Sequence, residues 1–194
     1  MMLKELQKCV NLNWVKKNNV WDIAVYGSYA RGKYNPNDID IAIILKEPSA
    51  AKNKLLLSQE LRKRLPEKKC AFDVKTVDLN DLLDSGFLAR EAILAEGLSI
   101  LKKVSLAERF GFTAFALIEY SLKKLTKAKQ KMFYYALSGR KKGTGFLSRC
   151  GGKIISKGVL KLPTKHLEEM RSLMEINDVS YKITFSLEYR TLHQ

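Results

Sequence analysis

Residues 23–44, IAVYGSYARGKYNPNDIDIAII, place two apolar runs on either side of a polar segment. The first run, residues 23–26, predicts a short buried strand that ends at Gly27-Ser28. The residues that follow are rich in glycine, asparagine and proline, which indicate a loop. The second run, residues 38–44, is rich in isoleucine and predicts another strand. We therefore expect a strand–loop–strand unit that organises the chain.

Two aspartates open the second predicted strand. Because side chains of a strand alternate between its faces, Asp38 and Asp40 point to one side, and Ile39 and Ile41 point into the core. Neighbouring carboxylates repel each other, and both stay ionised readily at neutral pH only when a cation lies between them. Mg²⁺ prefers such all-oxygen surroundings. The aspartate pair is therefore a candidate metal site.

The Gly27-Ser28 turn supplies a second part of the candidate site. Its backbone N–H groups and its hydroxyl can bind a phosphate. A phosphate-binding turn that precedes a metal-binding carboxylate pair is the equipment for phosphoryl or nucleotidyl transfer. Taken alone, a Gly-Ser turn before an Asp-x-Asp is also common in ordinary turns, so the interpretation needs further residues.

Those further residues carry a resemblance. Residues 27–32, GSYARG, followed by Asp38-x-Asp40, resemble the signature of the DNA polymerase β-like nucleotidyltransferase superfamily. This form of the motif is most similar to the small, minimal nucleotidyltransferase branch of that superfamily. The family uses a third carboxylate on a later strand, and Asp73 supplies one between apolar neighbours. Its closing helix and short strand are similar to residues 90–101, so the resemblance covers roughly residues 20–102, about half the chain.

The resemblance implies a reaction, a cofactor and a role for each carboxylate. A nucleoside monophosphate would move from an NTP substrate to an acceptor hydroxyl. Asp38 and Asp40 would coordinate two Mg²⁺ ions, which bind the triphosphate and activate the attacking hydroxyl. Asp73 would complete the second metal site and help to activate the acceptor. All three are thus expected to be catalytic residues and metal ligands.

The resemblance also implies a nucleotide-binding segment. Gly27 and Ser28 would bind the outer phosphates of the NTP. Either Arg31 or Lys33 would neutralise the charge that develops during transfer. The match to the family is firm for the glycine and the serine and weaker for these two basic residues.

The positive charge of the chain is unevenly distributed. The net charge is +15 over 194 residues. Residues 1–101 hold 16 Lys and Arg against 13 Asp and Glu, whereas residues 102–194 hold 19 against 7. This asymmetry favours a polyanionic partner such as RNA, although lysines that merely solvate the surface are the alternative. The loop over residues 139–145, GRKKGTG, either contacts nucleic acid through Arg140, Lys141 and Lys142 or is a plain linker.

Cysteine usage and hydropathy point to a cytoplasmic protein. No run of eighteen apolar residues exists, and the first residues lack the apolar region of a signal peptide, so we expect no membrane association. Cys9, Cys70 and Cys150 are odd in number and widely separated. They indicate free thiols in a reducing cytoplasm and argue against a zinc site or a disulfide framework.

The expected fold class is α+β. Residues 1–102 should form a nucleotidyltransferase fold with a mixed sheet flanked by helices. Residues 103–194 should form a smaller, basic C-terminal α+β domain of no recognised family. Its first element is predicted to be a helix, because Ser105 and Glu108 fit a capping box and apolar residues recur at helical spacing as far as Leu122. A second helix is expected over residues 126–137, with Met132, Phe133 and Tyr135 in the core.

Three functional hypotheses follow. The first is an enzyme that acts on a nucleic acid or protein acceptor, which the C-terminal half presents. The second is an antitoxin-like protein of the minimal nucleotidyltransferase type, which modifies or masks a partner protein. The third is a nucleic-acid-binding module with a degenerate catalytic core, against which the intact Asp38, Asp40 and Asp73 argue. A small-molecule acceptor such as an aminoglycoside is a further alternative, but it explains the basic half of the chain poorly.

Overall fold

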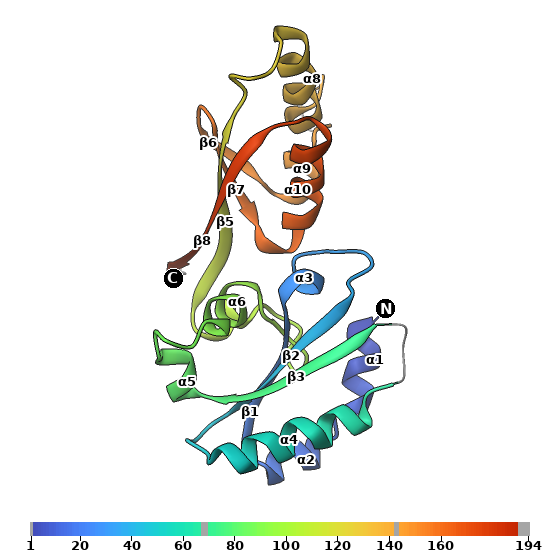
Figure 1. Ribbon diagram of the computed structural model, residues 1–194, viewed down its shortest axis with the longest axis vertical. Helices are drawn as coiled ribbons and strands as arrows, with labels where there is room; N and C mark the ends of the chain where they lie inside the picture. The colour runs from blue at the N-terminus through green and yellow to red at the C-terminus, as the bar shows by residue number, and fades with distance from the viewer. Residues whose placement is uncertain (1, 67–69, 142–143, 190–194) are drawn as a thin grey trace, which may run out of the picture. The chain divides into compact units, whose positions relative to one another are not determined.

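The computed structural model describes residues 2–66, 70–141 and 144–189 (Figure 1). The chain divides into two compact units, Met1–Gly111 and Phe112–Gln194, and each has its own sheet. The first sheet is mixed and the second is antiparallel, which confirms the expected α+β class. Within the described residues, none of the helices combines the length and the apolar composition needed to cross a bilayer.

The sheet of the first unit has the strand order β3-β2-β1-β4. The two apolar runs of residues 23–44 lie in β1 (Val20–Tyr26) and β2 (Asp38–Leu45), which pair antiparallel. Strand β3 (Ala71–Asp78) runs parallel to β2, and the short β4 (Leu98–Ser99) pairs antiparallel with β1. The strand–loop–strand unit of residues 23–44 therefore supplies the two central strands of the sheet.

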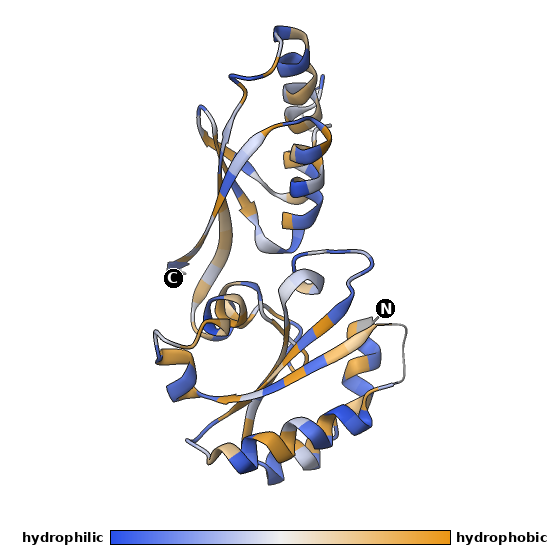
Figure 2. Cartoon of the chain, viewed as in Figure 1, coloured by the Kyte–Doolittle hydropathy of each residue, from blue (hydrophilic) through white to orange (hydrophobic). Residues whose placement is uncertain are grey.

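Helices cover both faces of this central pair, which explains its nearly continuous apolar sequence. Ile41 and Ile43 pack against one cluster, formed with α1 (Met2–Cys9), α2 (Leu12–Lys17) and α4 (Ala51–Arg64). Ala42 and Ile44 pack against the opposite cluster, formed with α5 (Leu79–Leu83), α6 (Ala89–Glu96) and α7 (Leu106–Arg109). Figure 1 shows α4 and α6 on opposite sides of the sheet, and Figure 2 shows hydrophilic residues on α4 alongside its hydrophobic ones.

Two helical segments of the first unit are each interrupted. Residues 2–17 form α1 and α2, because the side chain of Asn11 accepts a hydrogen bond from the N–H of Asn13 and begins a new helix. Residues 79–96 form α5 and α6. Asp78 caps α5 through a capping box with Asp81, so these two acids are structural.

The helix predicted from Ser105 to Leu122 is wrong after its first turn. Ser105 does cap a helix, but α7 ends at Arg109 and strand β5 (Phe112–Ser121) follows. Gly111 adopts a φ of +80° between them, a conformation that ends a helix readily. The sequence FTAFALIEYS also fits an alternating pattern, and its alternate residues Ala116 and Ile118 are fully buried in the second sheet.

The sheet of the second unit has the strand order β6-β7-β5-β8, with all pairs antiparallel. The remaining elements are β6 (Lys153–Ser156), β7 (Val159–Pro163), β8 (Ser180–Tyr189), α8 (Lys127–Ser138), α9 (Phe146–Cys150), η1 (Thr164–His166) and α10 (Leu167–Ile176). The helices lie along one face of this sheet (Figure 1). The core between them is only partly as predicted: Phe133 is fully buried, whereas Met132 is 66% exposed and Tyr135 is 38% exposed.

The buried carboxylate of Asp22 on β1 contacts Ser99 and Arg109, near the end of the first unit. Asp22 on β1 is fully buried and accepts hydrogen bonds from the hydroxyl of Ser99 at 2.8 and 2.9 Å and from the N–H of Ile23 at 2.7 Å. The Arg109 guanidinium lies 3.5 Å from it. Burial holds the pKa of the Asp22 carboxyl above its ordinary value, and the Ser99 hydroxyl opposes that rise.

Replacing Ser99 tests the contribution of its hydrogen bonds to Asp22. Ser99→Ala should lower the free energy of unfolding by about 1–3 kcal/mol, because Asp22 loses a hydrogen bond in a buried place. Without the hydroxyl, the folded-state pKa of Asp22 rises further above its unfolded value. Such a carboxyl destabilises the folded state increasingly as pH rises through that pKa, so the loss should be larger at about pH 7 than at about pH 4.

Urea unfolding at both pH values measures this difference. Ser172→Ala, which removes an exposed helix hydroxyl, is the control and should cost less than about 0.5 kcal/mol at either pH. An equal loss for Ser99→Ala at both pH values would contradict the role given to Asp22.

Candidate functional site

The pairing of three strands places the predicted carboxylates side by side. Asp40 is the register partner of Tyr26 on β1 and of Asp73 on β3. Asp38 lies two residues before Asp40 on the same strand and therefore on the same face. The structure thus brings together Asp38, Asp40 and Asp73, although 33 positions separate Asp40 from Asp73 in the sequence.

Burial and like charge together raise the pKa of the central carboxylate, Asp40. Burial, and then the charges of Asp38 and Asp73, raise the pKa of Asp40, while Lys75 and Arg31 lower it less. Burial and the charges of Asp40 and Asp73 also raise the pKa of Tyr26, whose phenol therefore stays protonated at neutral pH. A cation at this point would relieve the repulsion between the carboxylates.

Asp73 has cationic neighbours of its own. Its carboxylate lies 3.3 Å from the ammonium group of Lys75 and 3.8 Å from the guanidinium of Arg62. All three side chains are more than 40% exposed, so water screens both ion pairs and each contributes little to stability. Exchange of these pairs for a metal ion would therefore require little free energy.

The donor set fits Mg²⁺, although it is not closed around a single point. Within the described part of the chain, no group of three or more His, Cys, Asp or Glu side chains is arranged to hold a metal ion. The donors that are present are carboxylate oxygens, which Mg²⁺ prefers. The buried hydroxyl of Tyr26 has no hydrogen-bond partner among the described residues, so a polar group beside Asp40 remains to be satisfied.

Gly27 brings the chain backbone against Asp40. It follows β1 directly, has a φ of +74° and begins the short helix α3 (Gly27–Ala30). A Cβ atom at this position would lie 2.2 Å from Oδ2 of Asp40. Ser28 is the next residue, and its carbonyl accepts a hydrogen bond from the N–H of Lys33. The Gly-Ser turn and the carboxylates therefore form one site.

The two basic residues of the predicted site differ in their surroundings. Arg31 ends α3, and its guanidinium forms an ion pair of 2.8 Å with Glu96, which is only 7% exposed. Its charge lowers the pKa of Asp40, so it acts on the carboxylate site. Lys33 is exposed. The role of Glu96 as the partner of Arg31 was not predicted from the sequence. The signal for it was a single acid in the otherwise apolar run of residues 93–97, ILAEG.

The predicted nucleic-acid-binding residues belong to the second unit. The guanidinium of Arg140 lies 5.3 Å from the ring centre of Tyr135 on α8. Lys141 is exposed, and its carbonyl accepts a hydrogen bond from the Thr144 hydroxyl. Lys142 lies outside the described residues. Arg140, Lys141 and Tyr135 place basic and aromatic groups together at the end of α8, and single-stranded nucleic acid can bind such groups by charge and stacking.

The close approach of Gly27 to Asp40 predicts a large effect of a single methyl group. Gly27→Ala should lower the free energy of unfolding by more than the 1–2 kcal/mol that a left-handed conformation alone costs a non-glycine residue, because the new Cβ also collides with Asp40. Gly111→Ala is a matched control: its φ is +80°, and nothing lies within 4 Å of the Cβ position. Thermal unfolding of both variants measures the difference, and equal losses would show that Asp40 does not pack on Gly27.

Comparison with known proteins finds one family and two solved structures. The family described as "Polymerase beta, Nucleotidyltransferase" matches residues 10–105. A crystal structure of a toxin–antitoxin with AMP-PNP is 22% identical, covers 52% of this chain and 73% of its own, and has a TM-score of 0.36. A mutant of the toxin–antitoxin MntA-HpeT is 18% identical, covers 47% and 72%, and has a TM-score of 0.32. No curated protein matches. Residues 10–105 of this chain, just under half of its length, therefore match the polymerase beta nucleotidyltransferase family.

Proposed function

We propose that this protein is a Mg²⁺-dependent nucleotidyltransferase that moves a nucleoside monophosphate from an NTP to an acceptor hydroxyl. One observation carries the proposal: Asp40 lies against the Gly27 backbone and beside Asp73 in the same register. A phosphate-binding turn and a set of repelling carboxylates thus meet at one end of two neighbouring strands. The family match over residues 10–105 supports the same chemistry.

The carboxylates hold the metal and orient the reacting groups in this proposal. Asp38 and Asp40 would hold two Mg²⁺ ions, and Asp73, whose carboxylate lies 3.3 Å from the ammonium group of Lys75, would complete the second metal site. When bound, Mg²⁺ neutralises the triphosphate and lowers the pKa of the attacking hydroxyl. Asp73 belongs to β3, the edge strand of the sheet, so in this proposal it is the residue that orients the acceptor.

The Gly-Ser turn and the basic residues bind the triphosphate. The absence of a side chain at Gly27 lets the phosphates approach the backbone beside Asp40, and the Ser28 hydroxyl adds a donor. Arg31 is held by Glu96 at 2.8 Å, which fixes its charge near Asp40 before substrate arrives. Lys33, exposed in the loop, is free to approach the outer phosphates.

RNA is the acceptor that the charge distribution favours. Residues 102–194 hold 19 Lys and Arg against 7 Asp and Glu, and the second unit also exposes Tyr134 and Tyr135 beside its lysines. A protein acceptor, as in an antitoxin-like member of the minimal branch, is the alternative that the GSYARG motif suggests. The free thiols Cys9, Cys70 and Cys150 suit a cytoplasmic location for either.

Replacing the carboxylates one at a time tests the reaction. Asp38→Asn and Asp40→Asn should each reduce transfer by about 100-fold or more, since each removes charge that stabilises the transition state. Asp84→Asn is the matched control, because Asp84 is an exposed loop carboxylate of the same unit. The assay incubates the protein with each labelled NTP, Mg²⁺, and total cellular RNA or protein. Label in RNA or in protein identifies the acceptor, and unchanged transfer in both site variants would reject the mechanism.

The acceptor proposal makes a separate prediction. The double variant Arg140→Gln/Lys141→Gln should weaken RNA binding, and the log–log slope of affinity against salt should become shallower by about 0.7 per lost phosphate contact. The double variant Lys165→Gln/Lys182→Gln removes the same charge from exposed positions elsewhere in this unit. Anisotropy titrations at several salt concentrations measure both. Equal effects of the two double variants would show that the basic residues act only through overall charge.

A further inference from the structure

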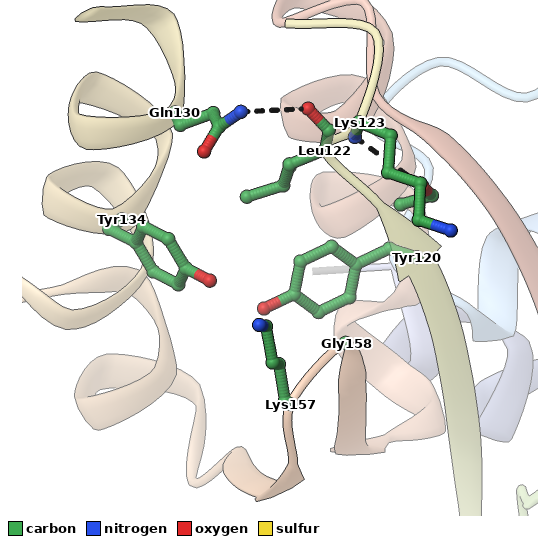
Figure 3. Close-up of a pocket in the computed structure, with 8 residues that line it drawn as sticks. Tyr120, Leu122, Lys123, Gln130, Tyr134, Lys157 and Gly158 are labelled. Carbon is green, nitrogen blue, oxygen red and sulfur yellow. Dashed lines mark hydrogen bonds between the residues drawn. The ribbon is translucent and has the colours of Figure 1, made fainter. Parts of the chain in front are cut away.

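A pocket of about 370 Å³ lies inside the second unit, apart from the residues of the carboxylate site. The end of β5, the first half of α8 and the turn between β6 and β7 form its walls (Figure 3). The volume falls within the range of small-molecule sites. The family match ends at residue 105, and the proposed transfer assigns no ligand to this pocket.

The walls of the pocket are already fixed by contacts of the fold. The N–H of Tyr120 donates to the carbonyl of Gly158 at 2.8 Å, and the Tyr120 ring packs edge-on against the buried Phe133. The side-chain amide of Gln130 donates to the carbonyls of Leu122 and Leu125 at 3.1 and 2.9 Å. Ligand binding would therefore require little ordering of these groups.

The polar groups of the pocket are arranged for an anion. Lys123 and Lys157 line it, whereas no carboxylate does, and neither lysine forms an ion pair within the residues that the structure describes. Figure 3 shows the ammonium group of Lys157 directed toward the hydroxyl of Tyr120, with the hydroxyl of Tyr134 also facing inward. Burial, and then Tyr134, raise the pKa of Tyr120, so its hydroxyl remains a donor at neutral pH.

The other lining groups suit an aromatic ring that carries an amino group. Both amide hydrogens of Gln130 are used within the fold, so its Oε1 remains an acceptor for a ligand. The side chain of Leu122 and the ring of Tyr134 supply apolar surface on either side of that oxygen (Figure 3). A base with an exocyclic amino group presents the complementary surface.

We infer that this pocket binds one nucleotide, with its phosphate between the lysine and tyrosine donors and its base against Leu122 and Gln130. Lysine binds phosphate as a point charge, and tyrosine hydroxyls add directed hydrogen bonds. A free nucleoside monophosphate and the 5′-terminal residue of an RNA strand share this chemistry. The inference rests on no residue of the carboxylate site and does not require the proposed transfer.

The test measures binding by calorimetry with the full chain carrying Asp40→Asn, in EDTA, so that metal-dependent binding at the carboxylate site cannot contribute. 5′-AMP should bind, and adenosine, which lacks the phosphate, should bind about 10-fold or more weakly. Lys157→Gln should weaken AMP binding by about 10-fold or more, and Tyr134→Phe, at a residue 40% exposed, by about 5-fold. Lys165→Gln, an equal charge change at an exposed position outside the pocket, should change it by less than about 2-fold.

A 5′-phosphorylated RNA hexamer and the same hexamer without the phosphate identify the source of the nucleotide. If the phosphorylated hexamer binds more tightly than AMP and loses affinity in Lys157→Gln, the ligand is the end of an RNA strand; if AMP binds more tightly, it is a free nucleotide. The inference is wrong if AMP does not bind, if AMP and adenosine bind equally, or if Lys157→Gln and Lys165→Gln have the same effect. Failure of transfer in the active protein would leave these binding results unchanged, so the two proposals fail separately.

Discussion

The close contact between Gly27 and Asp40 is the constraint on which the site depends. A side chain at position 27 would occupy the place of the Asp40 carboxylate, since its Cβ would lie 2.2 Å from Oδ2. The contact exists because Tyr26 and Asp40 are register partners in the central strand pair. A slip of one residue in that register would turn Asp40 into the core and Ile41 toward the turn. The burial of Ile39, Ile41 and Ile43 beneath the helices therefore also fixes the position of the carboxylates.

The site is electrostatically unfavourable on its own, and the surrounding charges only partly compensate. Burial, and then the charges of Asp38 and Asp73, raise the pKa of Asp40, whereas Lys75 and Arg31 lower it less. Arg31 in turn forms an ion pair with the nearly buried Glu96 at the end of α6. Such residual repulsion is typical of sites that need a cation or a charged substrate to complete them. Asp78, a structural acid of the same unit, has better compensation: it forms an ion pair with Lys54 and caps a helix.

Local patterns predicted most of the first unit, because its signals are short-range. The two strands, the glycine at the turn and the face shared by Asp38 and Asp40 all follow from residues 20–45. The position of Asp73 beside Asp40 required the family resemblance, since parallel pairing of β2 and β3 joins segments far apart in sequence. The partnership of Glu96 with Arg31 could not be predicted, because no local pattern specifies a contact across 65 positions.

The second unit was harder to predict because its strands depend on distant partners. Phe110, Phe115, Ile118 and Leu122 recur at nearly helical spacing, yet residues 112–121 also alternate. Pairing with β7 and β8, which lie 40 to 70 residues later in the chain, selects the strand. The pocket beside Tyr120 also depends on tertiary contacts, because its walls come from β5, α8 and the β6–β7 turn. Tertiary contacts therefore decide both the fold and the candidate ligand site of this half.

Divalent metal next to the Gly27 turn should relieve the repulsion among Asp38, Asp40 and Asp73. A crystal structure with Mn²⁺ and a non-hydrolysable NTP analogue, phased on the anomalous signal of manganese, would show whether it does. We expect anomalous peaks between the carboxylates of Asp38 and Asp40, with Asp73 turned away from Lys75 and the phosphates against Gly27. Manganese bound elsewhere, or an analogue bound without metal at these aspartates, would contradict it.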